Sequence, residues 1–312
     1  MGRKASAASQ RVALFYKTVS NKFTQGEVLT SAISIAYYVL FSIFPLIIII
    51  GNILPLFHIN TAPIASYLKL IFPDRIAKFI MPIIDSLLKS NSTGYISFGI
   101  LLAFWSVSSF VNAIRIGMNR IYGVREVELK QKWQITVWTR SITIFLTNLM
   151  ILIFALLILT FIFGQQVLEF LRPIFSLSVG EIEKIFSYRY PVVIITLIGA
   201  LYYLNYFLPN IKLKKRVIWP GVFTTLIGWV ALSWLFSYYL HNFHISWENY
   251  GIVGTFIIFM LWLNIASILF LVGTCVNAAI VTMNYGEVSY SVGHLAEYVQ
   301  EKRNRKNWHQ MH

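Results

Sequence analysis

The side chains that could carry out chemistry are few, because only 12% of the 312 residues are charged. His241 and His244 stand three residues apart, and Glu248 follows about one helical turn later. Two imidazoles and a carboxylate could together hold Zn²⁺, but these three lack the His-Glu-x-x-His frame that makes such a motif specific. We therefore interpret both histidines as interfacial side chains, and we expect neither a metal site nor a cofactor.

Nucleophilic and phosphate-binding motifs are absent from the sequence. It contains no glycine-rich phosphate loop and no nucleophile elbow, and Cys275 is its single cysteine. A lone cysteine cannot form a disulfide within the chain, so we interpret Cys275 as a small packing residue. These observations predict that the chain is not an enzyme.

Neutral polar and basic side chains offer a binding chemistry instead. Four polar residues recur near one face of a predicted helix: Asn264, Ser267, Thr274 and Asn277. Hydrogen bonds between helices would explain this face, and so would the lining of a polar cavity. Arginines that flank apolar segments could hold phosphate or carboxylate headgroups. The candidate substrate-binding residues are Asn112, Asn264, Asn277, Arg115, Arg120, Arg125 and Arg216.

Membrane helices must position these residues, because the chain is too apolar for a soluble protein. It is 57% hydrophobic and has a mean hydropathy of +0.66. A bilayer core about 30 Å thick requires about 20 apolar residues in a helix. Six stretches meet this requirement without a Lys, Arg, Asp or Glu in their interior: about 31–53, 95–114, 141–163, 191–208, 217–240 and 252–283. We predict an all-α, polytopic membrane protein with six transmembrane helices.

The basic residues predict which way these helices run. Nineteen of the 26 Lys and Arg residues lie before the first span, in the second-to-third and fourth-to-fifth loops, or in the tail. Because basic residues favour the cytoplasmic side, both termini are expected there. The net charge of +14 then reflects topology, so the expected partners are anionic lipids and not nucleic acid. We divide the chain into a basic cytoplasmic segment (1–29), a membrane domain (30–284) and a hydrophilic cytoplasmic tail (285–312).

Two segments have the pattern of short amphipathic helices at the membrane surface. Near the N-terminus the apolar stripe comprises Val12, Phe15, Tyr16, Val19 and Phe23. On the opposite side of the membrane it comprises Ile76, Phe79, Ile80, Ile83, Ile84, Leu87 and Leu88. Packing on the helix bundle explains the second stripe, and so would an opening for an amphipathic substrate. Pro45 lies deep in the first span and is expected to break that helix or to act as a hinge.

The chain also contains several distinctive segments. They are Ala36-Tyr37-Tyr38 with Phe41-Ser42-Ile43-Phe44-Pro45, then FWSVSSFVNAIRIGMNRIYGV, YYLNYFLPN, RVIWPGVFTT, and YGIVGTFIIFMLWLNIASILFLVGTCVNA in the last span. Together these segments, which fall between about residues 30 and 278, resemble the YihY/virulence factor BrkB family of bacterial inner-membrane proteins. The resemblance implies six helices and a location in the bacterial inner (plasma) membrane.

Some members of that family have carried the label ribonuclease BN, which the residues allow us to test. Metal-dependent RNA hydrolysis requires a cluster of carboxylates or histidines that holds the metal ions. The acids and histidines of the predicted cytoplasmic side are not spaced as such a cluster, so we reject nuclease activity. The virulence label implies an effect on the cell envelope without a mechanism.

Two functions fit these expectations. The first is transport of a lipid or another amphipathic envelope molecule along a groove between helices. The alternative is a non-transporting scaffold that organises envelope enzymes through its basic face and tail. An intramembrane enzyme ranks third, because a nucleophile and a base are missing.

Overall fold

The structure is a computed structural model that describes residues 2–53, 81–82, 96–129, 189–212, 216–242, 251–286 and 288–291, together with six single positions between 141 and 153. Most of the third predicted span, the apolar stripe from Ile76 to Leu88 and the basic end of the tail lie outside the described residues.

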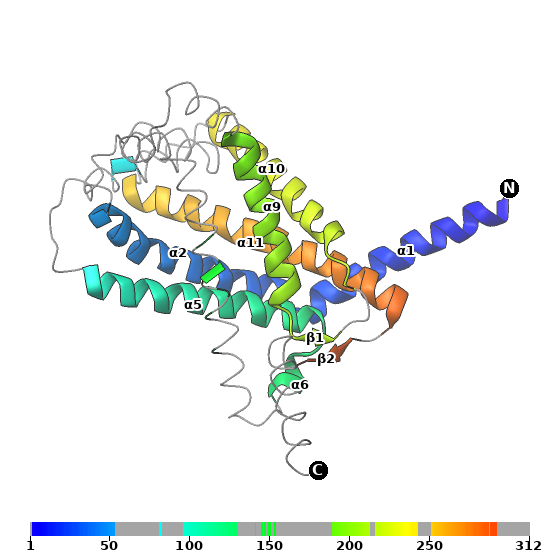
Figure 1. The fold of residues 1–312 in the computed structure, drawn as a ribbon. Helices are drawn as coiled ribbons and strands as arrows, with labels where there is room; N and C mark the ends of the chain where they lie inside the picture. Colours follow the sequence, from blue (N-terminus) through cyan, green and yellow to red (C-terminus); the bar gives the residue numbers. More distant parts are fainter. Residues whose placement is uncertain are drawn as a thin grey trace, which may run out of the picture.

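The described part is mostly helical, as the all-α prediction requires. Its elements are α1 (Gly2–Gln25), α2 (Val28–Ile53), α5 (Ile96–Ile121), α6 (Arg125–Leu129), α9 (Arg189–Phe207), β1 (Ile211–Lys212), α10 (Trp219–Asn242), α11 (Gly251–Tyr285) and β2 (Ser289–Tyr290). Helices α2, α5 and α11 lie side by side, α10 packs on α11, and α1 extends away from the bundle (Figure 1).

Two of these helices are long and apolar enough to cross a membrane, within the residues that the structure describes. They are α10 over Trp219–Tyr239 and α11 over Phe256–Tyr285. A third candidate is the pair of α1 and α2, which together would form one span bent by 57° at the break between them. The first, second, fourth, fifth and sixth predicted stretches fall on α2, α5, α9, α10 and α11 respectively.

Helix α5 continues beyond the predicted end of the second span at residue 114. That predicted end places Arg115 and Arg120 in the loop after the second span, which is wrong, because both lie within the helix and it ends at Ile121. Gly123 stops it with a φ of 77°, a value that glycine adopts at little cost. Its N–H donates to the Arg120 carbonyl, and the N–H of the next residue donates to the Asn119 carbonyl, which is the Schellman arrangement of a helix end.

A sharp bend separates α1 from α2 at Gly26 and Glu27. Glu27 has a φ of 45°, and a Cβ on Gly26 would lie 2.4 Å from the Ile121 Cγ1 atom of α5. Arg120 holds the bend, because its Nη1 atom is 3.1 Å from the Glu27 carboxylate and 3.3 Å from the Ser31 hydroxyl. Further along, α2 continues through Pro45 to Ile53, so this proline does not end the helix, and a hinge there stays a prediction.

Helices α10 and α11 approach one another at a pair of glycines. A Cβ on Gly221 would lie 2.3 Å from the Gly273 carbonyl oxygen, and a Cβ on Gly273 would lie 2.5 Å from the Gly221 carbonyl oxygen. Small residues at such crossings let two membrane helices pack backbone to backbone. The amide N–H of Gly221 donates to the Asn277 side chain at 2.7 Å and adds a hydrogen bond to this contact.

A short two-stranded ladder, which the sequence did not predict, joins the connection between α9 and α10 to the chain after α11. Strands β1 and β2 are antiparallel, with Ile211 opposite Tyr290. The backbone N–H of Ser291 also donates to the Asn210 carbonyl at 3.0 Å. The first residues of the predicted hydrophilic tail are thus bonded to the helix bundle.

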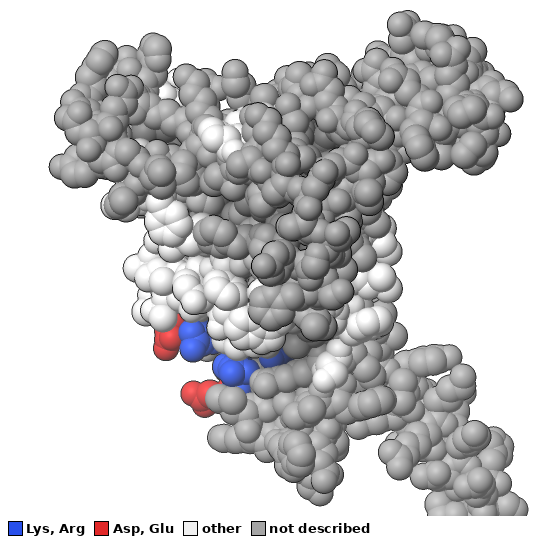
Figure 2. All heavy atoms as spheres, turned by 90° about the vertical axis from the view of Figure 1, so that its left-hand side faces the viewer, with Lys and Arg blue, Asp and Glu red and all other residues white. Residues whose placement is uncertain are grey.

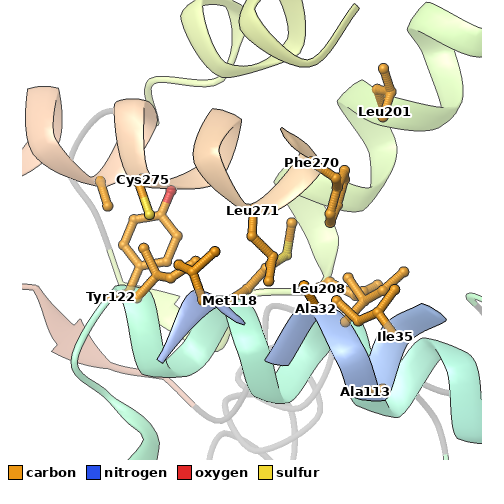
Figure 3. Close-up of a cluster of buried hydrophobic side chains, with 14 of the residues drawn as sticks. Ala32, Ile35, Ala113, Met118, Tyr122, Leu201, Leu208, Phe270, Leu271 and Cys275 are labelled. Atoms are coloured by element: carbon orange, nitrogen blue, oxygen red, sulfur yellow. The ribbon is translucent and has the colours of Figure 1, made fainter. Parts of the chain in front are cut away.

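The main hydrophobic core lies where α2, α5, α9 and α11 meet (Figure 3). Its labelled side chains include Ala32, Ile35, Ala113, Met118, Tyr122, Leu201, Leu208, Phe270, Leu271 and Cys275. Cys275 is buried and unbonded to another cysteine, as a packing residue should be. Burial also raises the pKa of the Tyr122 phenol, which follows the end of α5.

Candidate substrate-binding site

Three polar side chains line one face of α5. Asn112, Arg115 and Asn119 are separated by three and four residues, a spacing that places them above one another on a helix. Arg115 exposes 1% of its surface and Asn119 exposes none, while Asn112 is partly buried. The face therefore points into the protein and not toward its surroundings.

Arg115 is the largest fully buried side chain in the described part of the protein. Its Nη2 atom donates to the Asn112 Oδ1 atom at 2.9 Å, a bond that orients the guanidinium along the α5 face. Placing a cation in an apolar interior costs free energy unless other groups bind it. Ionisable side chains inside membrane helices are therefore rare, and they mark the paths of ions and substrates.

Asn119 connects this face to the next element of the fold. Its Oδ1 atom accepts the backbone N–H of Asn210 at 2.9 Å, just before β1 begins. Asn119 was not among the predicted site residues. Its spacing from Asn112 and Arg115 indicates the same helix face, but this signal is visible only if the predicted helix continues past residue 114.

Arg216 lies at the start of the segment that leads into α10, where it bonds the backbone. It donates to the carbonyl oxygens of Tyr206 and Ile211, the second at 3.1 Å, and its guanidinium lies 4.7 Å from the centre of the Tyr206 ring. A cation that binds the carbonyls at the end of α9 stabilises that helix end. These contacts give Arg216 a structural role.

Asn277 also bonds neighbouring helices. Its side chain accepts from the Gly221 backbone and donates to the Asn205 Oδ1 atom at 3.2 Å, and Asn205 in turn donates to the Leu201 carbonyl at 2.9 Å. Interhelical bonding, one of the two explanations for the polar face of α11, thus accounts for Asn277.

The other three residues of the α11 face do not share that bonding. Ser267 and Thr274 donate to carbonyls four residues earlier in their own helix. The buried Asn264 Oδ1 atom has no hydrogen-bond partner among the described residues. Buried acceptors are nearly always satisfied, so this oxygen is an exception in the described structure.

The remaining predicted arginines lie near the end of α5. Arg120 binds the bend between α1 and α2, and the half-buried Arg125 is the first residue of α6. Figure 2 shows the described charged side chains gathered at one edge of the face in view, with uncharged residues over the rest of the described surface. The structure therefore brings Arg115 and Asn112 into contact, while Arg120, Arg216 and Asn277 each serve a different contact.

The sequence predicts that His241 and His244 are interfacial and form no metal site with Glu248. The structure does not test this prediction, because these side chains lie outside the described residues. In the part of the chain that is described, no group of three His, Cys, Asp or Glu side chains is placed to hold a metal ion.

Comparisons with known proteins identify relatives over most of the chain. A family model described as virulence factor BrkB matches residues 19–291. The chain is similar to the "Putative ribonuclease-like protein YfkH" of Bacillus subtilis (strain 168), with 28% identity over 267 residues, which are 85% of this chain and 94% of that protein. No solved structure matches the chain.

Proposed function

The chain belongs to the virulence factor BrkB family, and we propose that it moves an anionic lipid, or another amphipathic envelope molecule with an anionic headgroup, across or within the bacterial inner membrane. In this proposal six helices cross the membrane and both termini are cytoplasmic, because 18 of the 26 Lys and Arg residues, without the buried Arg115, would then lie on the cytoplasmic side. The apolar lengths of α10 and α11 support the membrane location.

The burial of Arg115 is the observation that carries the proposal. Its planar guanidinium can donate two parallel hydrogen bonds to one phosphate or carboxylate group. The side chain lies inside a bundle built from apolar helices, with 1% of its surface exposed. An anionic headgroup that reached Arg115 would exchange bonds to water for charge-assisted bonds in a medium of low dielectric constant. Asn112 orients the guanidinium for this contact.

The other candidates extend this site in the proposal. Arg120 and Arg125 follow Arg115 along the chain toward the predicted cytoplasmic side, where they would attract a headgroup before it reaches the buried position. The Asn264 Oδ1 atom would accept a hydrogen bond from a hydroxyl or ammonium group of the substrate. Arg216 and Asn277 would keep α9, α10 and α11 in place around the path.

The outer face of α10 is suited to contact acyl chains. An open groove of about 440 Å³ on this helix is lined by Leu226, Ile227, Val230, Ala231 and Trp234. All five lining residues are apolar or aromatic, so the groove offers no bond to a headgroup but would bind a hydrocarbon tail. This face is consistent with a helix that contacts lipid.

Reconstitution into liposomes tests the proposal. Purified full-length protein is expected to speed the movement of a headgroup-labelled anionic lipid between leaflets relative to protein-free liposomes, because Arg115 gives the headgroup a partner inside the membrane. The measurement is the loss of fluorescence when a membrane-impermeant quencher is added. If the protein-containing and protein-free liposomes behave alike, the transport proposal fails. The scaffold function would then be tested by crosslinking to envelope enzymes.

We also propose that the chain is not a ribonuclease, in spite of the name of its relative. The purified protein should leave structured and single-stranded RNA intact with Mg²⁺, Mn²⁺ or Zn²⁺ present, because the sequence lacks a spaced cluster of metal ligands. Gel electrophoresis of end-labelled RNA would show this. Cleavage that survives repeated purification, and that a Glu27→Gln, Glu126→Gln or His294→Gln variant abolishes, would contradict the proposal.

A further inference from the structure

Helix α1 has one apolar stripe, and the protein covers only part of it. The stripe comprises Val12, Phe15, Tyr16, Val19 and Phe23. In its second half Val19 and Phe23 pack against the main hydrophobic core. In its first half Val12 exposes 55% of its surface and Tyr16 exposes 69%. The predicted amphipathic helix is therefore present, with the outer half of its apolar face unpaired in the described structure.

The covered and uncovered halves belong to one continuous surface. Residues at this spacing lie along a single side of an α-helix, so the side of α1 that packs on the bundle continues past the bundle's edge. Helix α1 contacts α11 and α5 and then runs outward to the N-terminus (Figure 1). Material that surrounds the bundle at this end would therefore also cover the outer half of the stripe.

The charges of α1 indicate what that surrounding material is. Over Gly2–Gln25 the helix contains Arg3, Lys4, Arg11, Lys17 and Lys22 and not one Asp or Glu. Arg11 and Lys22 lie to one side of the stripe, and Lys17 lies nearly opposite to it. A helix with an apolar stripe flanked by cations lies in the interface of a membrane, where the stripe contacts acyl chains and the cations contact phosphates.

We propose that the outer half of α1 binds the bilayer surface next to the bundle, and that it requires anionic lipid headgroups to do so. The stripe would enter the boundary between headgroups and acyl chains, while Arg11 binds the phosphates. This contact is independent of transport. Because Arg120 holds the bend that joins α1 to α2, it would also connect the lipid composition of the membrane to α5.

Site-directed spin labelling of the full chain in nanodiscs tests this contact. A nitroxide is placed at Tyr16→Cys on the stripe, or at the exposed Gln10→Cys on the opposite side, in a Cys275→Ala background. The nanodiscs contain phosphatidylcholine alone or together with phosphatidylglycerol. With phosphatidylglycerol, the label at position 16 should collide more with oxygen than with a water-soluble nickel chelate. The label at position 10 should show the opposite preference.

Charge variants test the role of the cations. Arg11→Gln should lower the ratio of membrane-bound to free helix about fivefold, the factor that corresponds to roughly 1 kcal/mol for a basic residue near an anionic surface. Lys17→Gln removes a charge on the helix side of Gln10 and should lower this ratio less. The two-component spectrum of the label at position 16 reports this ratio. Equal access of the nickel chelate to positions 10 and 16 in anionic nanodiscs would overturn the proposal. So would dipolar coupling between labels on two chains, which would identify a second copy as the partner.

Discussion

Replacing Gly273 with valine should separate α10 from α11 and leave little correctly folded protein. A Cβ at this position would lie 2.3 Å from the Thr225 hydroxyl oxygen and 2.5 Å from the Gly221 carbonyl oxygen. One of these obstacles is backbone, which cannot rotate away, so the helices themselves would have to move. That movement would also break the Gly221–Asn277 hydrogen bond. We expect a loss at or above the upper end of the range of about 1–3 kcal/mol for overpacked cores.

Gly228→Ala is the matched control, because it adds a Cβ on the same helix pair. That atom would meet the flexible Leu269 side chain at 3.1 Å and no backbone atom within 4 Å among its three nearest neighbours. Size-exclusion profiles and thermal unfolding in detergent should show Gly273→Val aggregated or strongly destabilised, while Gly228→Ala stays close to the wild type. Equal behaviour of the two variants would show that the glycine contact is looser than the structure indicates.

Replacing Arg115 with glutamine should reduce the movement of anionic lipid at least tenfold. Hydrogen bonds to charged groups are worth about 1.5–3 kcal/mol, which corresponds to roughly a 10-fold to 100-fold change in rate if the bond forms at the barrier. Arg115→Lys should retain part of the activity, because it keeps the charge but loses the planar pair of donors. Initial rates in liposomes, normalised to the amount of folded protein, measure both effects.

Lys212→Gln controls for the loss of one positive charge, since this exposed residue lies on β1 and not on the buried face of α5. Its transport rate should equal that of the wild type. Thermal unfolding of each variant separates loss of the site from loss of the fold. An Arg115→Gln variant that folds and still moves anionic lipid at the wild-type rate would remove Arg115 from the proposed path.

The helical content of the described chain could be predicted because long apolar runs in a bilayer have to form helices. The end of α5 could not be located by the same criterion. Arg115 and Arg120 interrupt the apolar run and were interpreted as loop residues, whereas Met118 and Ile121 continue the buried face as far as the glycine at 123. The sequence does not distinguish a buried arginine from an exposed one. Only the packing around α5 reveals that an arginine on this helix is buried.

The contacts between distant segments were the other features that the sequence could not show. Two residues at β1 pair with two residues at β2, and strands this short leave no alternating pattern to detect. The contact of Gly221 with Gly273 depends on how α10 and α11 cross, which neither helix determines alone. By contrast, the stripe on α1 was predicted correctly, because its spacing is a property of one helix.

The preference for headgroup charge tests the central claim most directly. Two lipids with identical labelled acyl chains, one with a phosphatidylglycerol headgroup and one with a phosphatidylcholine headgroup, are followed in liposomes that contain the full-length protein. We predict that the anionic lipid moves faster, because its headgroup carries a net negative charge that Arg115 balances, whereas the phosphatidylcholine headgroup has no net charge. We also predict that Arg115→Gln removes this preference. Equal rates for both lipids in the wild type, or a preference that survives Arg115→Gln, would contradict a headgroup site at Arg115.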